Sequence, residues 1–260
     1  MLRALNTSAT GMHAQEQNVN TISNNISNVN TTGFKKERAE FEDLLYEQSI
    51  DKGARSSGDS QYTIGKQAGS GARVTATRRI HTQGSIKITD NPFDVSIQGD
   101  GFFPVMVGDK IRYTRDGSFG PDAEGFITTN SGHKIAPGIQ VPPNTRSLSI
   151  SKDGKVDAWL ANDKEPVRVG DIKVFKFVNP AGLRDLGGNL AEETTASGNA
   201  IEHTPGLNNA GYLFQGSLET SNVQIVDEMT NLIKAQRAYE MNSKVMGVAD
   251  QMLQTVNNIR

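Results

Sequence analysis

The chain has 260 residues, and its 27 Lys and Arg against 29 Asp and Glu leave a net charge of −2. A chain of this length can bury a core either as one large domain or as two smaller ones. The near-neutral charge without a basic block argues against nucleic acid as a partner. The absence of cysteine excludes disulfides, thiol nucleophiles and thiolate metal sites.

Membrane and export signals are missing by the usual criteria. The longest nearly apolar stretch, residues 102–107, contains a proline and is too short to span a bilayer, so we expect no membrane insertion. The first 34 residues lack the cationic start and apolar run of a secretory signal. Ordinary rules then predict a cytoplasmic protein, unless a dedicated export machine reads another feature.

The N-terminal region carries a helical pattern. Apolar residues recur at steps of three and four between residues 2 and 29, which predicts a helix. We expect it to end at Thr32-Gly33-Phe34, where the glycine can take a left-handed conformation. Arg3 and Glu16 are its only formal charges, so the ion pairs that support a solvent-facing helix are missing. Alone in water this helix should be mostly unfolded.

A second, longer helical stripe runs from residue 225 to residue 259. As one helix, residues 220–259 would be about 60 Å long, more than a compact domain of this size needs. The N-terminal surface, poor in charge and rich in Asn, Ser and Thr, can be enclosed by copies of itself without repulsion, which favours assembly over a helical hairpin inside a monomer. From the periodicity we predict assembly contacts at Leu5, Met12, Val19, Ile22, Ile26, Leu232, Tyr239, Val245, Met252 and Val256.

The middle of the chain has a different residue pattern from the two ends. Residues 36–50 predict a short helix or turn, and the Gly- and Ser-rich residues 52–71 predict an extended or flexible stretch. From residue 73 to residue 215, short runs alternate with period two and are separated by turn dipeptides, as in an antiparallel β domain. The clearest runs are 86–88, 95–97, 148–150 and 173–178, and the turn dipeptides are Asp100-Gly101, Asp116-Gly117, Glu124-Gly125 and Asp153-Gly154.

These patterns predict an α+β chain, with N- and C-terminal helices around a central antiparallel all-β domain and an extended Gly/Ser-rich segment. We divide it into an N-terminal helix at 1–35, an extended segment at 36–72, a β-rich outer domain at 73–217 and a C-terminal helix at 218–260.

Candidate catalytic residues are few. A carboxylate pair drawn from Asp90, Asp94, Asp100, Asp109, Asp116 and Asp122 would suit glycan hydrolysis, but several adjoin glycines in predicted turns, where Asp usually bonds the turn backbone. The histidines, His13, His81, His133 and His203, lack the i, i+4 spacing of a helical metal site. We predict no catalytic site, cofactor or metal. A glycan-binding or glycan-hydrolysing β protein of the cell envelope remains the alternative from another class.

Several segments of the chain carry a family resemblance. They are Ser23-Asn24-Asn25-Ile26-Ser27-Asn28-Val29-Asn30-Thr31-Thr32-Gly33-Phe34-Lys35, Gly101-Phe102-Phe103, Tyr113-Thr114-Arg115-Asp116-Gly117-Ser118-Phe119, Thr204-Pro205-Gly206-Leu207, Gly216-Ser217-Leu218-Glu219-Thr220-Ser221-Asn222-Val223 and Gln236-Arg237-Ala238-Tyr239-Glu240-Met241-Asn242-Ser243-Lys244. Together these segments resemble the bacterial flagellar rod and hook family, most of all its distal rod members.

The resemblance implies a structural protein that polymerises into the distal rod, a rigid helical tube that transmits torque from the motor to the hook. It implies terminal helices paired as an inner coiled coil, with the β domain outside and a straightening role for the segment at about 49–71. Implied partners are further copies, the proximal rod protein, the hook protein, the outer-envelope ring proteins and the flagellar type III export apparatus. The implied location is the basal body, from periplasm to outer membrane. A proximal rod or hook subunit is the alternative within the family.

Overall fold

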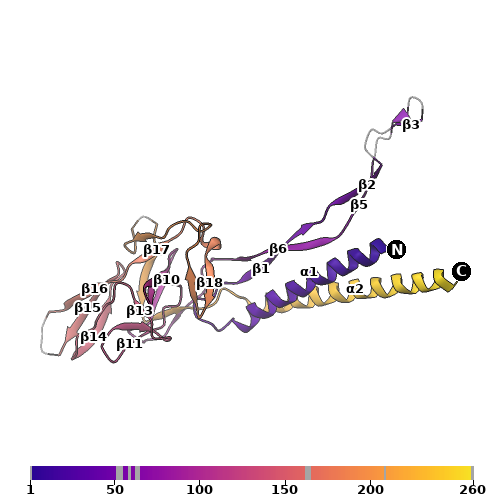
Figure 1. Cartoon of the computed structure of the whole chain (residues 1–260). Helices are drawn as coiled ribbons and strands as arrows, with labels where there is room; N and C mark the ends of the chain where they lie inside the picture. Colours follow the sequence, from indigo (N-terminus) through magenta and orange to yellow (C-terminus); the bar gives the residue numbers. More distant parts are fainter. Residues whose placement is uncertain are drawn as a thin grey trace. The chain divides into compact units, whose positions relative to one another are not determined.

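The computed structural model describes residues 2–50, 55–57, 60–61, 65–161, 165–207 and 209–258 (Figure 1). The chain forms two compact units. The helical unit contains Met1–Ile26, Glu37–Arg78 and Gln224–Arg260, and the β unit contains Ser27–Lys36 and Arg79–Val223. Helices at both ends and antiparallel strands between them confirm the predicted α+β class.

Two long helices belong to the helical unit. Helix α1 spans Leu2–Ser27 and helix α2 spans Ile225–Asn258. At 1.5 Å per residue, the 34 residues of α2 extend about 51 Å. The two helices lie side by side in Figure 1, and they touch where the Asn25 side chain donates to Glu228 at 3.3 Å.

The predicted end of α1 is wrong by six residues. The helix stops at Ser27, and residues 28–33 are turns. Gly33 does adopt the left-handed conformation, with φ at +67°. Its role is packing rather than capping, because a Cβ there would lie 2.7 Å from the Arg115 carbonyl carbon.

A two-stranded ribbon completes the helical unit, so the short helix or turn predicted for residues 36–50 is wrong. Within β1, Ala39 is buried, and exposed and half-buried residues alternate from residue 40 to residue 43. Each strand pairs with one that begins about 3 to 30 residues after it ends. A local sequence pattern does not show which distant residues will pair. The ribbon strands are β1 (Glu37–Asp43) with β6 (Ala72–Arg79), β2 (Tyr46–Ile50) with β5 (Lys66–Gly69), and β3 (Arg55–Ser57) with β4 (Ser60–Gln61).

The described parts of the Gly/Ser-rich stretch include the short strands β3, β4 and β5. Residues 51–54, 58–59 and 62–64 lie outside the described residues.

The β unit is built on a seven-stranded antiparallel sheet in the order β11-β12-β13-β9-β10-β19-β18, beside a three-stranded sheet in the order β14-β15-β16. Three two-stranded pairs, β17 with β20, β21 with β8 and β22 with β7, and one short 3₁₀ helix, η1 (Pro180–Gly182), complete it. Its strands are β7 (Ile86–Ile88), β8 (Val95–Gln98), β9 (Phe103–Val107), β10 (Lys110–Thr114), β11 (Phe119–Pro121), β12 (Ile127–Thr129), β13 (Lys134–Ile135), β14 (Thr145–Ile150), β15 (Lys155–Leu160), β16 (Val167–Asp171), β17 (Val174–Lys176), β18 (Arg184–Gly187), β19 (Leu190–Glu192), β20 (Ile201–His203), β21 (Tyr212–Gln215) and β22 (Ser217–Glu219).

Two of the four predicted turn dipeptides close hairpins. Glu124-Gly125 joins the paired strands β11 and β12, and Asp153-Gly154 joins β14 and β15. Asp100-Gly101 and Asp116-Gly117 instead connect strands that do not pair. At the latter, glycine is required for close packing, because a Cβ on Gly117 would lie 1.6 Å from the Val95 carbonyl oxygen.

The main core lies inside the β unit. Its fully buried side chains come from both larger sheets and from β8, with Val95, Phe103, Ile135 and Val156 at 0% exposure. Phe103 and Phe119 pack edge to face with ring centroids 5.2 Å apart. A smaller aromatic cluster, Phe102, Tyr113 and Phe177, lies beside it. The β unit therefore closes its own apolar core.

Candidate assembly surface and motif junction

One face of α2 packs toward α1 with small or polar side chains at seven-residue spacing. Glu228, Ala235 and Ala249 are buried, and Asn242 between them is half-buried. Gly11 of α1 lies opposite Asn242, where an added Cβ would be 2.8 Å from the amide nitrogen. Seven-residue spacing with small side chains is the pattern of two helices in close contact.

Large apolar side chains of α2 are exposed on more than one side of the helix, and Val256 continues the seven-residue series that includes Ala235 and Ala249. Met229, Ile233, Val245, Met252 and Val256 are 46–54% exposed in this chain. Apolar surface that continues along a helix and finds no cover within the chain marks an interaction site. We call this set of five exposed residues, taken together from all sides of the helix, the α2 outer face.

The ten predicted assembly residues differ in how far they are exposed within the chain. Ile22 is buried within the chain, at 5% exposure. Tyr239, Val245, Met252 and Val256 are exposed. The remaining residues, Leu5, Met12, Val19, Ile26 and Leu232, are half-buried. Met229 and Ile233 were not among the predicted contacts, although their spacing of four along one helix face was readable.

Asn25 joins three parts of the helical unit and was not singled out by the sequence. Its amide donates to the Glu37 carbonyl at 2.8 Å, and its side-chain oxygen accepts from the Glu37 N–H at 2.9 Å. The same amide donates to Glu228, and both side chains are 1% exposed. A buried polar contact of this kind fixes the register of two helices.

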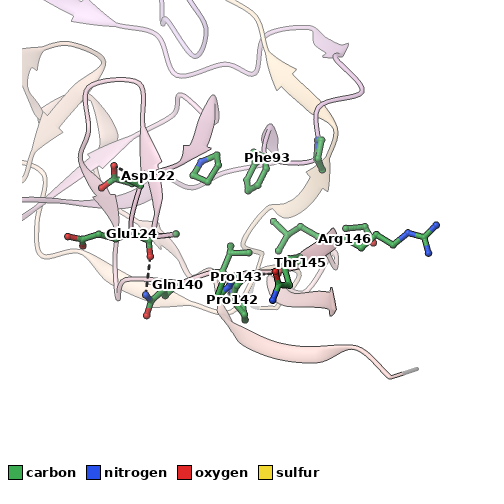
Figure 2. A pocket seen from close by; sticks show the side chains of 16 residues that line it. Phe93, Asp122, Glu124, Gln140, Pro142, Pro143, Thr145 and Arg146 are labelled. Carbon is green, nitrogen blue, oxygen red and sulfur yellow. Dashed lines mark hydrogen bonds between the residues drawn. The ribbon is translucent and has the colours of Figure 1, made fainter. Parts of the chain in front are cut away.

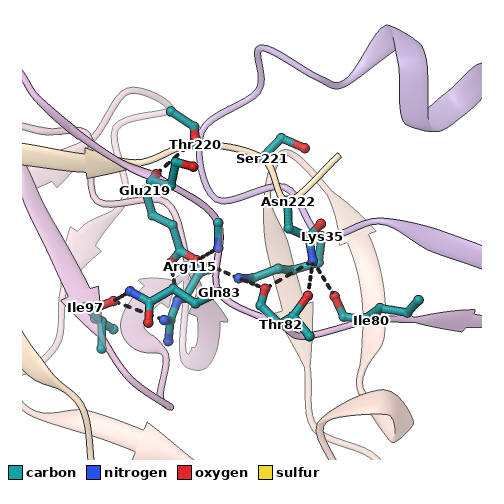
Figure 3. A network of polar contacts seen from close by, with 12 residues as sticks. Lys35, Ile80, Thr82, Gln83, Ile97, Arg115, Glu219, Thr220, Ser221 and Asn222 are labelled. Carbon is teal, nitrogen blue, oxygen red and sulfur yellow. Dashed lines mark hydrogen bonds and ion pairs between the residues drawn. The ribbon is translucent and has the colours of Figure 1, made fainter. Parts of the chain in front are cut away.

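The β unit contains a buried ionic group around Glu219, shown in Figure 3. Glu219 is 1% exposed and accepts hydrogen bonds from Lys35 Nζ at 2.6 Å and Arg115 Nε at 2.6 Å. Its Oε1 also accepts the Gly84 N–H at 2.8 Å. Arg115 donates further to the carbonyls of residues 97, 99 and 101. We call Lys35, Arg115, Glu219 and the neighbouring Asn222 the Glu219 cluster.

Opposing forces act on the ionisation of this cluster. Burial raises the pKa of Glu219, but Arg115 and Lys35 lower it more, so the net pKa lies below the ordinary value. Burial lowers the pKa of Lys35, and the attraction of Glu219 compensates only in part. Glu219 therefore stays ionised near neutral pH.

Asn222 bonds the cluster to two further backbone segments, at residue 36 and at residues 80–82. Its amide donates to the carbonyls of Ile80 at 2.9 Å and Thr82 at 3.1 Å. Its side-chain oxygen accepts the Lys36 N–H at 2.7 Å. Each polar atom of the amide group is thus used to connect separate segments.

The cluster brings together four of the segments that carry the family resemblance. Lys35 ends the N-terminal signature, Arg115 lies in 113–119, Gly101 begins 101–103, and Glu219 lies in 216–223. The sequence identified these segments but assigned no role to the three charges. The available signal was the placement of Lys, Arg and Glu inside otherwise uncharged or turn-forming motifs.

His81 packs beside this cluster, edge-on to Phe102 with ring centroids 5.7 Å apart. Burial, and after it the nearby positive charges of Arg79, Lys35 and Arg115, together lower its pKa to about 4. The imidazole is therefore neutral at physiological pH.

The candidate hydrolytic carboxylates bond to their own turns. Asp116 accepts the Ser118 N–H at 3.0 Å, and Asp122 accepts the Ala123 N–H at 2.7 Å. Asp122 and Glu124 line an open groove of about 570 Å³ between the turn at residues 121–125 and the start of β14 (Figure 2). Glu124 faces Lys134, with its Oε2 3.3 Å from Nζ. Asp116, which precedes Gly117, and Asp122 therefore bond turn backbone, and Glu124 forms a surface pair.

Among the residues that the structure describes, no group of three or more His, Asp or Glu side chains is placed to hold a metal ion. Within the same part of the chain, neither helix is both long and apolar enough to cross a bilayer.

Comparison with protein families gives three matches along the chain. Residues 5–35 match the flagella basal body rod protein model, and residues 96–158 match the flagellar hook protein FlgE/F/G D1 domain. Residues 215–259 match the flagellar basal body rod FlgEFG protein C-terminal model. The matches include both helices and much of the β unit.

Curated relatives match over the whole length. The flagellar basal-body rod protein FlgG of Buchnera aphidicola subsp. Schizaphis graminum is 47% identical over 260 residues, covering 100% of both chains. FlgG of Borreliella burgdorferi is 46% identical over 263 residues, covering 100% of this chain and 99% of its own. FlgG of Bacillus subtilis is 37% identical, with both chains fully covered. The chain therefore belongs to the flagellar basal-body rod FlgE/F/G family and is a structural protein of the rod, not an enzyme.

Proposed function

We propose that this chain is the subunit of the distal rod, a tube of identical copies that carries torque from the motor to the hook. Full-length similarity to proteins named FlgG supports this assignment. In the proposed tube, α1 and α2 pair as a coiled coil in the inner layer and the β unit lies outside. The segment 36–72 would then be the rod-specific part.

The observation that carries the proposal is the α2 outer face. Its five large apolar side chains are 46–54% exposed along a helix of 34 residues. Fully burying an exposed side chain of this size contributes roughly 1.5–3 kcal/mol, so covering these half-exposed side chains with neighbouring copies would contribute about half of that for each. A contact between unlike surfaces, repeated by rotation and translation, builds an open helix.

The sparse charge of α1 supports the same arrangement. Arg3 and Glu16 are its only formal charges, and Arg3 pairs with Glu47 of the ribbon. A helix enclosed by copies of itself does not bring like charges together if it carries almost none. The half-buried Leu5, Met12, Val19 and Ile26 would lose their remaining exposure there, together with Leu232 and Tyr239.

The proposal also places the protein in the cell. Subunits would leave the cytoplasm through the flagellar type III apparatus and assemble between the periplasm and the outer membrane. There they would join the proximal rod at one end and the hook at the other, inside the envelope rings.

The test is a charge placed on the α2 outer face. In the source bacterium, the chromosomal copy is replaced by Val245→Glu combined with Met252→Glu, and isolated basal bodies are examined by electron microscopy. We expect normal secretion of the subunit but loss of the distal rod and of swimming. Val178→Glu is the matched control, since Val178 is 82% exposed on the β unit, and it should leave rods intact.

Labelling then fixes the position in the rod. An epitope at the Val178 loop should be detected between the envelope rings and the hook in intact basal bodies. Label in the hook or next to the inner membrane would assign the chain to the hook or the proximal rod instead. Normal rods from the doubly charged variant would reject the assembly surface.

A further inference from the structure

We infer that the Glu219 cluster is a clamp that holds together, on the β unit, the chain segments leading into α1 and α2 before either helix is ordered. The inference goes beyond the assembly role, because it concerns the single subunit. It assigns a function to three buried charges that neither the fold class nor the α2 outer face explains.

Three segments meet at the clamp. Residues 33–36 follow α1, residues 219–222 precede α2, and residues 80–85 pass between them. Backbone groups bond these segments to one another: Gly33 N–H to the Glu219 carbonyl at 2.8 Å, Ile80 N–H to the Lys36 carbonyl at 2.8 Å, and Thr220 N–H to the Ser85 carbonyl at 2.8 Å. The segment after α1 and the segment before α2 are therefore bonded to each other directly, and also through residues 80–85.

Buried charged side chains lie between these three segments. Lys35 Nζ contacts Glu219 Oε1 and also donates to the Thr82 carbonyl at 2.8 Å, so one ammonium group joins all three segments. The Lys35 and Glu219 side chains are 5% and 1% exposed. Pulling either segment away would leave a buried charge without its partner, which is strongly unfavourable.

Arg115 ties the three segments to the main core. Its guanidinium pairs with Glu219 and donates to the carbonyls of Ile97 at 3.1 Å and Gly99 at 2.5 Å, at the end of β8. Strand β8 carries Val95 and Ile97, which are buried in the core. The clamp is therefore anchored to the main apolar core of the β unit.

The clamp does not need the helices. Every contact given for it comes from residues 33–36, 80–85, 97–101, 115 and 219–222, all outside α1 and α2. Helix α1 ends at Ser27 and α2 begins at Ile225, so the nearer end of each helix lies only a few residues from a clamped segment. Holding two ends together in advance removes the loop-closure entropy that later pairing of the helices would otherwise require.

The competing interpretation is a buried ion pair that stabilises the whole β unit and nothing more. The two interpretations differ in where loosening occurs when the cluster is weakened. A clamp releases residues 33–36, 80–85 and 219–222 by local opening while the core stays closed. A general stabilising pair makes all β-unit amides exchange faster together.

The experiment is amide hydrogen exchange on the dilute full-length monomer, comparing wild type with Glu219→Gln. In the wild type we expect Gly33, Lys36 and Gly84 amides to be protected. In Glu219→Gln they should exchange at least about 10-fold faster, while the Val105 and Val156 amides keep their wild-type rates. Glu124→Gln, at an exposed Glu paired with Lys134, is the matched control and should change none of them.

Two outcomes would overturn the clamp. One is wild-type protection at Gly33 and Lys36 no greater than within α1 and α2. The other is equal acceleration of core and cluster amides in Glu219→Gln. Should that variant fail to fold, Lys35→Met retains the Glu219–Arg115 pair and must still accelerate Lys36 and Ile80 selectively. The exchange experiment measures only monomers. Its result therefore does not depend on whether the chain assembles into a rod, and the two proposals can fail separately.

Discussion

The helical unit and the β unit bury their apolar residues in opposite ways. In the β unit the large side chains, such as Phe103 and Ile135, are fully enclosed within one chain. In the helical unit the buried side chains are mostly small, such as Ala14, Ala235 and Ala249, while Met252 and Val256 stay about half exposed. From this comparison we expect that the β unit folds as a single subunit, whereas the helical unit would gain its main hydrophobic stabilisation from neighbours.

Polar groups follow the same division. The β unit fixes its buried charges in the Glu219 cluster, where each has partners within the chain. The helical unit has one buried polar contact, Asn25 with Glu228 and Glu37, among the contacts described here, and most of its ribbon ion pairs are exposed. Exposed ion pairs contribute about 1 kcal/mol or less each. They do not replace the missing apolar contacts.

The largest expected difference is in amide exchange. In a dilute monomer, amides such as Ile22 of α1 and Val245 of α2 should exchange at least about 1000-fold faster than Val105 and Val156 of the β core, because helices without apolar cover open easily. Mass-resolved hydrogen exchange on the full-length monomer measures this directly. Slow exchange at Ile22 and Val245 would show that the helical unit is stable alone.

The same samples give a control for assembly. In isolated rods, the exchange of Ile22 and Val245 should slow towards that of the core, because neighbouring copies would cover both helices. Rods in which these amides remain fast would contradict the enclosure of the helices.

The next effect concerns the β unit alone. Arg115→Met removes the side chain that bonds the cluster to the end of core strand β8, as well as one charged partner of the buried Glu219. Unlike Glu219→Gln, it therefore loosens the core itself, and we expect the free energy of unfolding to fall by about 3–5 kcal/mol. Trp159, the single tryptophan of the chain, lies in β15 and reports this unfolding by fluorescence in denaturant. Arg168→Met, which removes an exposed pair with Asp171, should cost less than about 1 kcal/mol. Equal losses in the two variants would remove the special role of the cluster.

The limits of the sequence are clear from particular residues. Both helices followed from apolar steps of three and four, and the strands 86–88 and 148–150 from alternation, since these patterns reflect local geometry. Strand β1 was missed because its partner β6 lies about 30 residues away. The clamp was missed because Lys35, Arg115 and Glu219 are 80 and 104 residues apart in sequence, and only the tertiary fold makes them neighbours.

Acid provides a smaller effect on the β unit. His81 has a pKa of about 4 in the folded chain against 6.5 in model compounds, so the unfolded chain binds more protons between these values. Stability should therefore fall as pH drops from 6.5 to 4, by at most about 3 kcal/mol. Glu219, whose pKa is lowered, adds a further loss only below its ordinary value. Denaturant unfolding of the monomer at each pH measures the slope.

Replacing the imidazole separates His81 from the carboxylates. His81→Phe keeps an aromatic ring against Phe102, and we expect its stability to vary less than that of the wild type between pH 6.5 and pH 4. His13→Asn, at an exposed position on α1, should retain the wild-type slope. An unchanged slope in His81→Phe would assign the acid sensitivity to other groups.

The smallest expected effect compares two glycines in the helical unit. Gly247 of α2 has no atom within 4 Å of an added Cβ, so Gly247→Ala should stabilise the helix by about 1 kcal/mol through helix propensity alone. At Gly11 the new methyl would lie 2.8 Å from the Asn242 amide, so displacement of that side chain should cancel most of the same gain. The midpoint of acid dissociation of isolated rods compares the two variants.

Comparing the two glycine variants in the monomer tests whether the helices are paired there. If the helices are unpaired in the dilute subunit, the methyl at Gly11 meets no Asn242, and both substitutions should raise helical circular dichroism by similar amounts. In the rod only Gly247→Ala should remain favourable. A Gly11→Ala variant that is neutral in both states would mean that the two helices already pack together in the single subunit, and the contrast between the two units would then be one of degree.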